Sequence, residues 1–234
     1  MKRLGILLDA VVAIRQMGGG KTPDPLHVIS MLEMAGVDSI VYTMMQAGAA
    51  EERDLRMLKE TIHSHFNLRL VPTMENAQAA IQAKAEMVTM IDRDSTSIRS
   101  VNAVEKEALL APIVSFLRTN GIVVNMLVDT DANQLRTAAR MGCDYVELNT
   151  DKYTGAASLT LMEQELENMK AMAMAAKKLT LSVTLSGHIN HNNIRELLDI
   201  EEIEEINIGH SVFARALFVG LDQAVRDFAT LIKK

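Results

Sequence analysis

Short apolar runs alternate with amphipathic segments along the whole chain of 234 residues. Each apolar run has the length of a buried strand, and the segment after it repeats its apolar positions with helical spacing. The runs predicted as strands are Leu4–Asp9, Ser39–Thr43, Leu68–Val71, Met87–Ile91, Ile122–Val128, Asp144–Leu148, Leu179–Leu185 and Ile203–Ile208. The pattern therefore predicts eight strands, each followed by a helical segment.

Polar residues and glycines indicate where the predicted helices begin and end. Gly36 ends the first helix, and one of Asp129, Thr130 and Asp131 is the expected N-cap of a later one. The predicted helices run from Pro23-Asp24-Pro25 to about Ala35, over Glu51–Phe66, Glu75–Ala85 and Val104–Thr119, to an end near Met141, and over Ser158–Lys177, His191–Asp199, Ser211–Phe218 and Leu221–Ile232. The polar stretch Asp92 to Ser100 is predicted as a loop.

Eight strand and helix pairs without a low-complexity linker predict parallel βα units in one sheet. The expected architecture is a closed (β/α)8 barrel, the TIM barrel, formed as a single domain by residues 1–234. An open doubly wound sheet is the alternative, because it also alternates strands with helices. The glycine-rich segment Met17–Thr22 does not form a P-loop, since Arg15 stands where that motif needs its first glycine. We interpret it as a flexible loop.

Two Gly-His pairs follow the last two predicted strands. Gly209-His210 ends the eighth strand and Ser211 opens a helix, while Gly187-His188 follows the seventh. Backbone N–H groups at a helix N-terminus carry a positive partial charge, and in barrels the turns after strands seven and eight often bind phosphate. The pattern therefore predicts a phosphate site. Its expected residues are Ser186, Gly187, His188, Gly209 and His210.

Composition narrows the expected partners. The formal net charge of −6 and the pI near 5.5 argue against a nucleic-acid or anionic-membrane surface. No apolar run is long enough to cross a membrane, and the single Cys143 cannot form an intrachain disulfide. We therefore expect a cytoplasmic protein. His27, His63, His65 and His191 lack metal-ligand spacing and are expected on the surface or in helices, so neither a metal nor a cofactor is predicted.

Several segments together resemble a known family. They are Asp9, Arg15, Pro23-Asp24-Pro25, Ala35-Gly36, Arg53-Asp54, Asp129, Tyr153, Gly187–Asn193, Glu205–His210, Arg215-Ala216 and Gly220-Leu221. This set resembles pyridoxine 5′-phosphate synthase over essentially the whole chain. The resemblance implies a (β/α)8 barrel that condenses 1-deoxy-D-xylulose 5-phosphate with aminoacetone 3-phosphate, without a metal, and that assembles as a homo-octamer.

The chain departs from the family pattern at the acid and base groups. The family's N-L-E after the third strand corresponds to Asn67-Leu68-Arg69, so a base replaces an acid. Its H-L-R-E-D-R-R corresponds to Thr43–Ala49, which has no titratable group, and its H-T-G corresponds to Asn149-Thr150-Asp151. Its G-H-G aligns with Ser186-Gly187-His188, where a shift of one residue returns His188 to the catalytic position. In the opening strand only Asp9 is kept.

These departures leave three functions open. One is a catalytically silent or impaired protein that still binds a phosphorylated small molecule, as a sensor or regulator in vitamin B6 metabolism. Another is an active enzyme, with His188 and Asp9 as catalytic residues or with different chemistry. The third is a structural subunit of a homo-oligomer or of a complex with a genuine synthase. Arg69 and Arg93 are either a second anion site at the barrel mouth or solvated charges on its rim.

Overall fold

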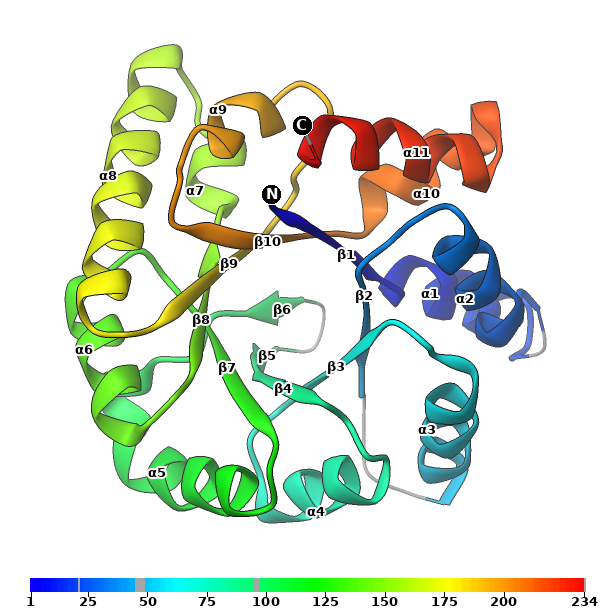
Figure 1. Ribbon diagram of the computed structural model, residues 1–234, viewed down its shortest axis with the longest axis horizontal. Helices are drawn as coiled ribbons and strands as arrows, with labels where there is room; N and C mark the ends of the chain where they lie inside the picture. The colour runs from blue at the N-terminus through cyan, green and yellow to red at the C-terminus, as the bar shows by residue number, and fades with distance from the viewer. Residues whose placement is uncertain (21, 45–48, 95–96, 234) are drawn as a thin grey trace.

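A closed ring of parallel strands forms the centre of the molecule (Figure 1). The computed structural model describes residues 1–20, 22–44, 49–94 and 97–233. Within these residues the strands follow the order β1-β10-β9-β8-β7-β4-β3-β2, and each neighbouring pair is parallel. They are β1 (Arg3–Leu7), β2 (Ser39–Thr43), β3 (His65–Leu70), β4 (Met87–Met90), β7 (Val123–Val128), β8 (Tyr145–Asn149), β9 (Ser182–Ser186) and β10 (Ile203–Ile208). The predicted (β/α)8 barrel is confirmed, and the open sheet is excluded.

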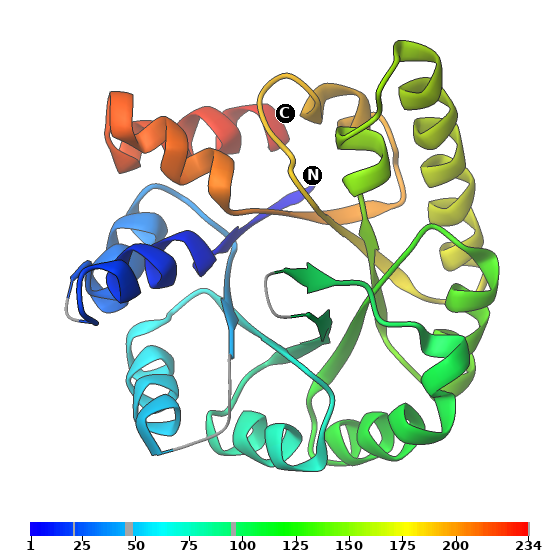
Figure 2. The same cartoon turned by 180° about the vertical axis from the view of Figure 1, so that it is seen from behind.

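Helices surround the ring of strands on all sides (Figures 1 and 2). The helices among the described residues are α1 (Asp9–Met17), α2 (Pro25–Met34), α3 (Ala49–Thr61), α4 (Met74–Gln82), α5 (Ala103–Thr119), α6 (Ala132–Met141), α7 (Asp151–Thr154), α8 (Leu159–Lys178), α9 (Ile194–Leu198), α10 (His210–Val219) and α11 (Leu221–Ile232). Of the three candidate N-caps before α6, Asp131 is the one that accepts from the helix, through the N–H groups of Asn133 and Gln134.

The third strand begins earlier than predicted, and the helix before it is shorter. The helix expected to reach Phe66 ends at Thr61, and β3 starts at His65. Polar and apolar residues alternate along β3 from His65 to Leu70, which is the spacing of a strand with two different faces. The prediction that His65 lies on the surface or in a helix is therefore wrong. His65 is half-buried in the strand, and burial together with nearby Arg3 lowers its pKa.

Three further elements differ from the prediction. Asp9 begins the helix α1 instead of ending a strand, and Asp151 begins the short helix α7. The helix expected at His191–Asp199 is reduced to α9. His191 precedes it and stacks on Phe228 of α11, with ring centroids 3.9 Å apart. A side chain expected on the surface or in a helix thus packs against the C-terminal helix.

Part of the segment predicted as a polar loop is a small antiparallel hairpin. It consists of β5 (Asp92–Arg93) and β6 (Ile98–Arg99), and both views place it within the ring of strands (Figures 1 and 2). The ion pair between Asp92 and Lys106 of α5 holds its base, and this contact lowers the pKa of Asp92. Two other predicted loops lie partly outside the described residues, because they contain Lys21 and residues 45–48.

Each barrel strand has an apolar face toward the helices and a largely polar face toward the barrel interior. In β3, Phe66, Leu68 and Leu70 join the main hydrophobic core, while Asn67 and Arg69 are buried on the other face. Interiors of such barrels are usually filled by branched apolar side chains. Here the buried polar set is Ser39, Thr43, Asn67, Arg69, Thr89, Asn125, Thr137, Glu147, Thr150, Thr184, Ser186, Glu205 and Asn207. Most of these residues belong to the barrel strands.

Candidate active site

A cavity of about 530 Å³ opens at the carboxyl ends of the barrel strands. This is the end at which barrels of this class carry their chemistry. Its walls combine strand ends, the start of α1, the β5–β6 hairpin and the turns after β9 and β10. Its lining residues include Asp9, Thr43, Arg69, Arg93, Asn149, Asp151, Ser186, Gly187, His188, Gly209, His210 and Ser211. Every residue predicted for the site lines this one cavity.

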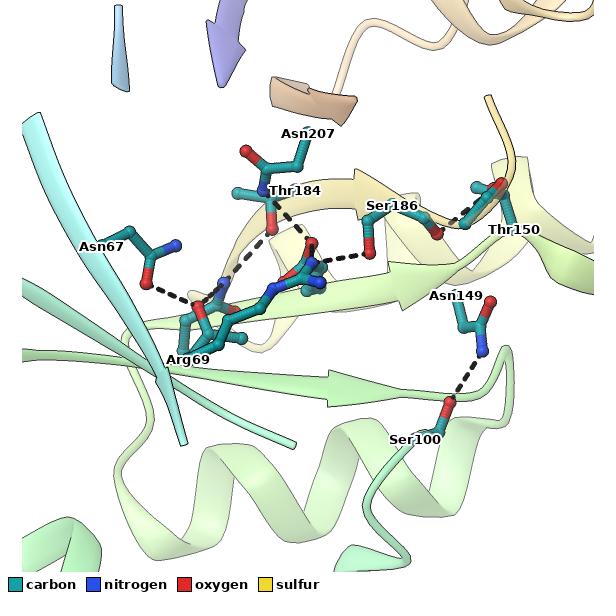
Figure 3. Close-up of polar contacts among 12 residues, drawn as sticks. Asn67, Arg69, Ser100, Asn149, Thr150, Thr184, Ser186 and Asn207 are labelled. Atoms are coloured by element: carbon teal, nitrogen blue, oxygen red, sulfur yellow. Dashed lines mark hydrogen bonds and ion pairs between the residues drawn. The ribbon is translucent and has the colours of Figure 1, made fainter. Parts of the chain in front are cut away.

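At the floor of the cavity lies Arg69, labelled in Figure 3, which forms a buried ion pair with Glu147. The Arg69 side chain crosses the barrel from β3 and donates to the Glu147 carboxylate and to the Ser186 hydroxyl, 2.9 Å away. Asn207 donates to the same Glu147 oxygen at 3.1 Å. Because β3 and β9 stand on opposite sides of the ring, Arg69 ties two facing walls together.

The ion pair leaves polar atoms unsatisfied. The Nε of Arg69 and the hydroxyl of Thr43 are buried and have no hydrogen-bond partner among the described residues. Both side chains line the cavity. Buried polar atoms without partners are costly, so these two positions are suited to a ligand or to water.

Below the floor, polar side chains continue through the barrel. Thr89 donates to Asn67 at 2.9 Å, and the Asn125 amide donates to Thr89 at 3.1 Å and to Thr184 at 3.3 Å (Figure 3). At the amino end of the barrel, Glu205 is 1% exposed and lies 3.3 Å from the Arg3 guanidinium. Burial raises the pKa of Glu205 to about 7, although Arg3 acts in the opposite direction.

The turn after β9 has left-handed backbone conformations at two successive residues. Gly187 has φ +122° and His188 has φ +47°. A Cβ on Gly187 would lie 2.6 Å from the Asp151 carboxylate, so only glycine allows that carboxylate to approach. The His188 Nδ1 lies 2.7 Å from the Asp151 Oδ1. The turn therefore presents an imidazole paired with a carboxylate at the cavity wall.

The turn after β10 places the N-terminus of α10 at the cavity. The N-cap residue of this helix, Gly209, has no side chain to cap it, and the first internal bond runs from the N–H of Val212 to the carbonyl of Gly209 at 3.0 Å. The N–H groups of His210 and Ser211 precede that bond, in the region where helices bind anions. The Ser211 hydroxyl donates to the Ile189 carbonyl at 2.6 Å. This bond joins the two Gly-His turns.

Glycine is required at the start of this turn. A Cβ on Gly209 would lie 2.9 Å from the Cβ of Leu7, at the end of β1. This close packing of Gly209 against β1 brings the start of α10 over the barrel.

The remaining predicted residues come from separate elements of the cavity wall. Asp9 lies in the first turn of α1, and Arg93 is exposed on β5 of the hairpin. Arg69 lies at the floor in its ion pair with Glu147, so the two arginines face the same cavity from different depths.

Several residues of the site were not predicted as site residues. Asp151 pairs with His188, Glu147 pairs with Arg69, and Ser211 bonds the other turn. Glu147 could have been identified from the polar and apolar alternation of β8, which places it on the same face as Tyr145 and Asn149. Asp151 and Ser211 carry no comparable local signal, because their partners belong to other βα units.

The described residues offer neither a metal cluster nor a membrane-spanning helix. They contain no group of three or more His, Cys, Asp or Glu side chains placed to hold a metal ion. They also contain no helix with the length and apolarity needed to cross a membrane.

Known proteins resemble this chain over its whole length. The chain is 34% identical to a pyridoxine 5′-phosphate synthase of Geotalea daltonii, over 100% of this chain and 99% of that protein. It is 33% identical to the protein of the same name from Geobacter sulfurreducens, with the same coverage. The tryptophan synthase alpha chain of Legionella pneumophila shares the fold, with a TM-score of 0.63 at 12% identity over 99% of this chain and 92% of that one. Residues 4–234 match the family model described as pyridoxal phosphate biosynthesis protein PdxJ. With that match over nearly its whole length, the chain belongs to the PdxJ family.

Proposed function

We propose that this barrel binds a phosphorylated small molecule of vitamin B6 biosynthesis and has lost or changed the family's acid–base catalysis. The phosphate binds at the N-terminus of α10 and the adjoining turn after β9, through Ser186, Gly187, His188, Gly209 and His210. The observation that carries the proposal is the uncapped start of α10 at the cavity. Such a site needs only backbone N–H groups and glycines, and no side chain with a tuned pKa.

The floor of the cavity supports the second half of the proposal. The synthase reaction joins a ketone phosphate to an amine and closes a ring, which requires several proton transfers. Arg69 cannot accept a proton, and it holds the Glu147 carboxylate in an ion pair. A general acid or base contributes about 10²- to 10⁴-fold in rate, so losing such groups has a large effect.

The phosphate site is tested by calorimetry with inorganic phosphate, pyridoxine 5′-phosphate and 1-deoxy-D-xylulose 5-phosphate. His210→Asp places a negative charge at the helix start and is expected to weaken binding by about tenfold or more. His210→Gln is the neutral control and is expected to stay within about threefold of the unmodified protein. Absence of binding for every phosphate compound would overturn the proposed function.

An active synthase is the second candidate, and the contact between His188 and Asp151 favours it. A histidine beside a carboxylate is a common acid–base arrangement, and Asp9 lines the same cavity. Purified protein supplied with both substrates is then expected to form a product with pyridinol absorbance, and His188→Ala to abolish it. Unchanged turnover in His188→Ala would remove His188 from the catalytic set.

Self-association is part of the proposal, either for the binding protein or for a structural or regulatory subunit. Helices α1 and α10 contact each other and expose apolar side chains, among them Met17 at 88%, Leu217 at 82% and Phe218 at 88%. Exposed apolar groups of this size favour burial against another copy. Light scattering is expected to report an oligomer, and a monomer at all concentrations would contradict this part of the proposal.

A further inference from the structure

Among the described residues, the imidazole of His188 has a side-chain partner at Nδ1. Its Nδ1 lies 2.7 Å from the Asp151 Oδ1, while the ring lines the cavity. An ionised carboxylate only accepts hydrogen bonds, so the proton of a neutral ring sits on Nδ1. The Nε2 then carries the lone pair, and it is available to accept a proton.

Backbone geometry holds the two side chains together. Thr150 and Thr154 both donate to the carbonyl of Gly187, the latter at 3.4 Å, and the Asn193 amide donates to the carbonyl of His188 at 3.2 Å. The N–H of Asp151 donates to the Asn149 side chain at 2.9 Å. These contacts fix the left-handed turn on one side and the start of α7 on the other.

The left-handed conformation of His188 is energetically unfavourable, and the local contacts hold the residue in it. A residue other than glycine at φ +47° is uncommon, and such conformations concentrate at functional sites. The glycine before it removes the Cβ that would block Asp151. Both residues of the turn thus favour the contact between the imidazole and the carboxylate.

A contribution to folding stability does not explain why His188 and Asp151 are paired. The His188 and Asp151 side chains are 79% and 46% exposed, and exposed ion pairs contribute little to folding. By contrast, the pair lies beside the anion-binding N-terminus of α10, to which the hydroxyl of Ser211 ties the same loop. Its position therefore favours a role in the chemistry of a bound ligand.

We propose that Asp151 is a positioning residue that makes His188 a proton acceptor for a phosphorylated hydroxyketone bound in the cavity. This inference rests on the proposed phosphate site. The Nε2 of His188 takes a proton from the carbon next to the ligand's carbonyl, and the electron pair of the broken C–H bond forms the enolate. Asp151 stabilises the imidazolium until the proton returns, so no oxidant or reductant is needed.

The first test reads the imidazole directly and needs no ligand. In ¹⁵N-labelled protein with the His188 ring in its neutral form, long-range ¹H–¹⁵N spectra are expected to show the tautomer with the proton on Nδ1. Asp151→Asn, whose amide can donate to Nδ1, is expected to shift the ring toward the opposite tautomer, and Asp151→Glu to retain the original one. Asp222→Asn, an exposed carboxylate on α11, is the matched control and leaves His188 unchanged. The same tautomer in Asp151→Asn as in the unmodified protein would overturn the proposal.

The second test measures proton transfer. The unmodified protein in D₂O is expected to exchange the hydrogen next to the carbonyl of 1-deoxy-D-xylulose 5-phosphate, and Asp151→Asn to do so about 100-fold more slowly at saturating ligand. Phosphate affinity stays within about threefold in this variant, because the backbone donors are unchanged. Binding without exchange overturns the inference alone, whereas absence of binding overturns the proposed function. Unchanged thermal unfolding of Asp151→Asn confirms that the exchange rate reports chemistry.

Discussion

The Arg69 guanidinium and the Glu147 carboxylate meet inside the barrel, with side chains that are only 4% and 0% exposed. Taking two charges out of water is costly, and their attraction offsets that cost only while both are present. The pair therefore constrains both residues: neither can change alone without leaving a buried charge. It also occupies the part of the cavity where the family's pattern places an acid.

Arg69→Met is expected to destabilise the protein by about 3–5 kcal/mol, because it leaves Glu147 buried without its cation. Arg69→Met/Glu147→Met is expected to recover most of that loss, since both charges leave the interior together. Urea unfolding of the single and double variants measures the difference. Additive effects of the two substitutions would contradict the coupling.

The pH dependence of stability is expected to report Glu205. Its pKa is about 7 in the folded protein and near the ordinary value of 4.5 in the unfolded chain. The folded state therefore binds the extra proton between these values, so this residue lowers the free energy of unfolding as pH rises from about 4.5 to 7. Glu205→Gln removes the titration. Its stability relative to the unmodified protein is expected to rise across that window by a few kcal/mol and to level off above it.

The matched control for this experiment is Glu163→Gln, which changes an exposed glutamate on α8. Its unfolding free energy is expected to run parallel to that of the unmodified protein between pH 4.5 and 8. If the unfolding free energy of Glu205→Gln also ran parallel to that of the unmodified protein, Glu205 would have the same pKa in the folded and unfolded states. That result would contradict the effect of burial on Glu205.

Gly5 in β1 provides space for the polar interior. A Cβ at this position would lie 1.9 Å from the Oδ1 of Asn207, whose amide donates to Glu147. Gly5→Ala is expected to destabilise the protein by about 1–3 kcal/mol through overpacking. The same substitution in an Asn207→Ala background should cost less, and this non-additivity is measured by chemical unfolding. Equal costs in both backgrounds would show that the side chain of Asn207 is not the obstacle.

Cys143 is expected to resist alkylation in the folded state. Burial raises the pKa of its thiol to about 12, so almost no thiolate is present at neutral pH. Mass spectrometry after iodoacetamide treatment at pH 8 is expected to find the folded protein unmodified and the urea-unfolded protein modified. Rapid alkylation of the folded protein would indicate an accessible thiolate and contradict the burial of Cys143.

The barrel could be predicted from sequence because the apolar residues of its outer shell follow a pattern within each short segment of chain. Apolar residues facing the helices recur along each strand, so existence and order of the strands follow from periodicity. Element boundaries were less predictable where the interior is polar. The first half of β3 contains His65 and Asn67, and these polar positions made it resemble the end of a helix.

The candidate site was predictable where backbone features determine it. Gly187 and Gly209 mark turns at strand ends, and the rule that strand ends share one face of a barrel brings them together. Side-chain pairing could not be predicted in the same way. Arg69 and Glu147 are 78 positions apart, and Asp151 and His188 are 37 apart. Each contact depends on the register between strands and on the direction of individual side chains.

The two faces of β3 have different roles: the apolar face maintains the fold, and the polar face can change the chemistry of the barrel interior. Phe66, Leu68 and Leu70 hold the strand against the helices, whereas Asn67 and Arg69 contact interior side chains. A mutation on the interior face can invert a charge while the outer shell keeps the fold. Function in such a barrel therefore diverges through paired substitutions in which one residue compensates for the other. Arg69 and Glu147 form such a pair, and a later change must replace both together.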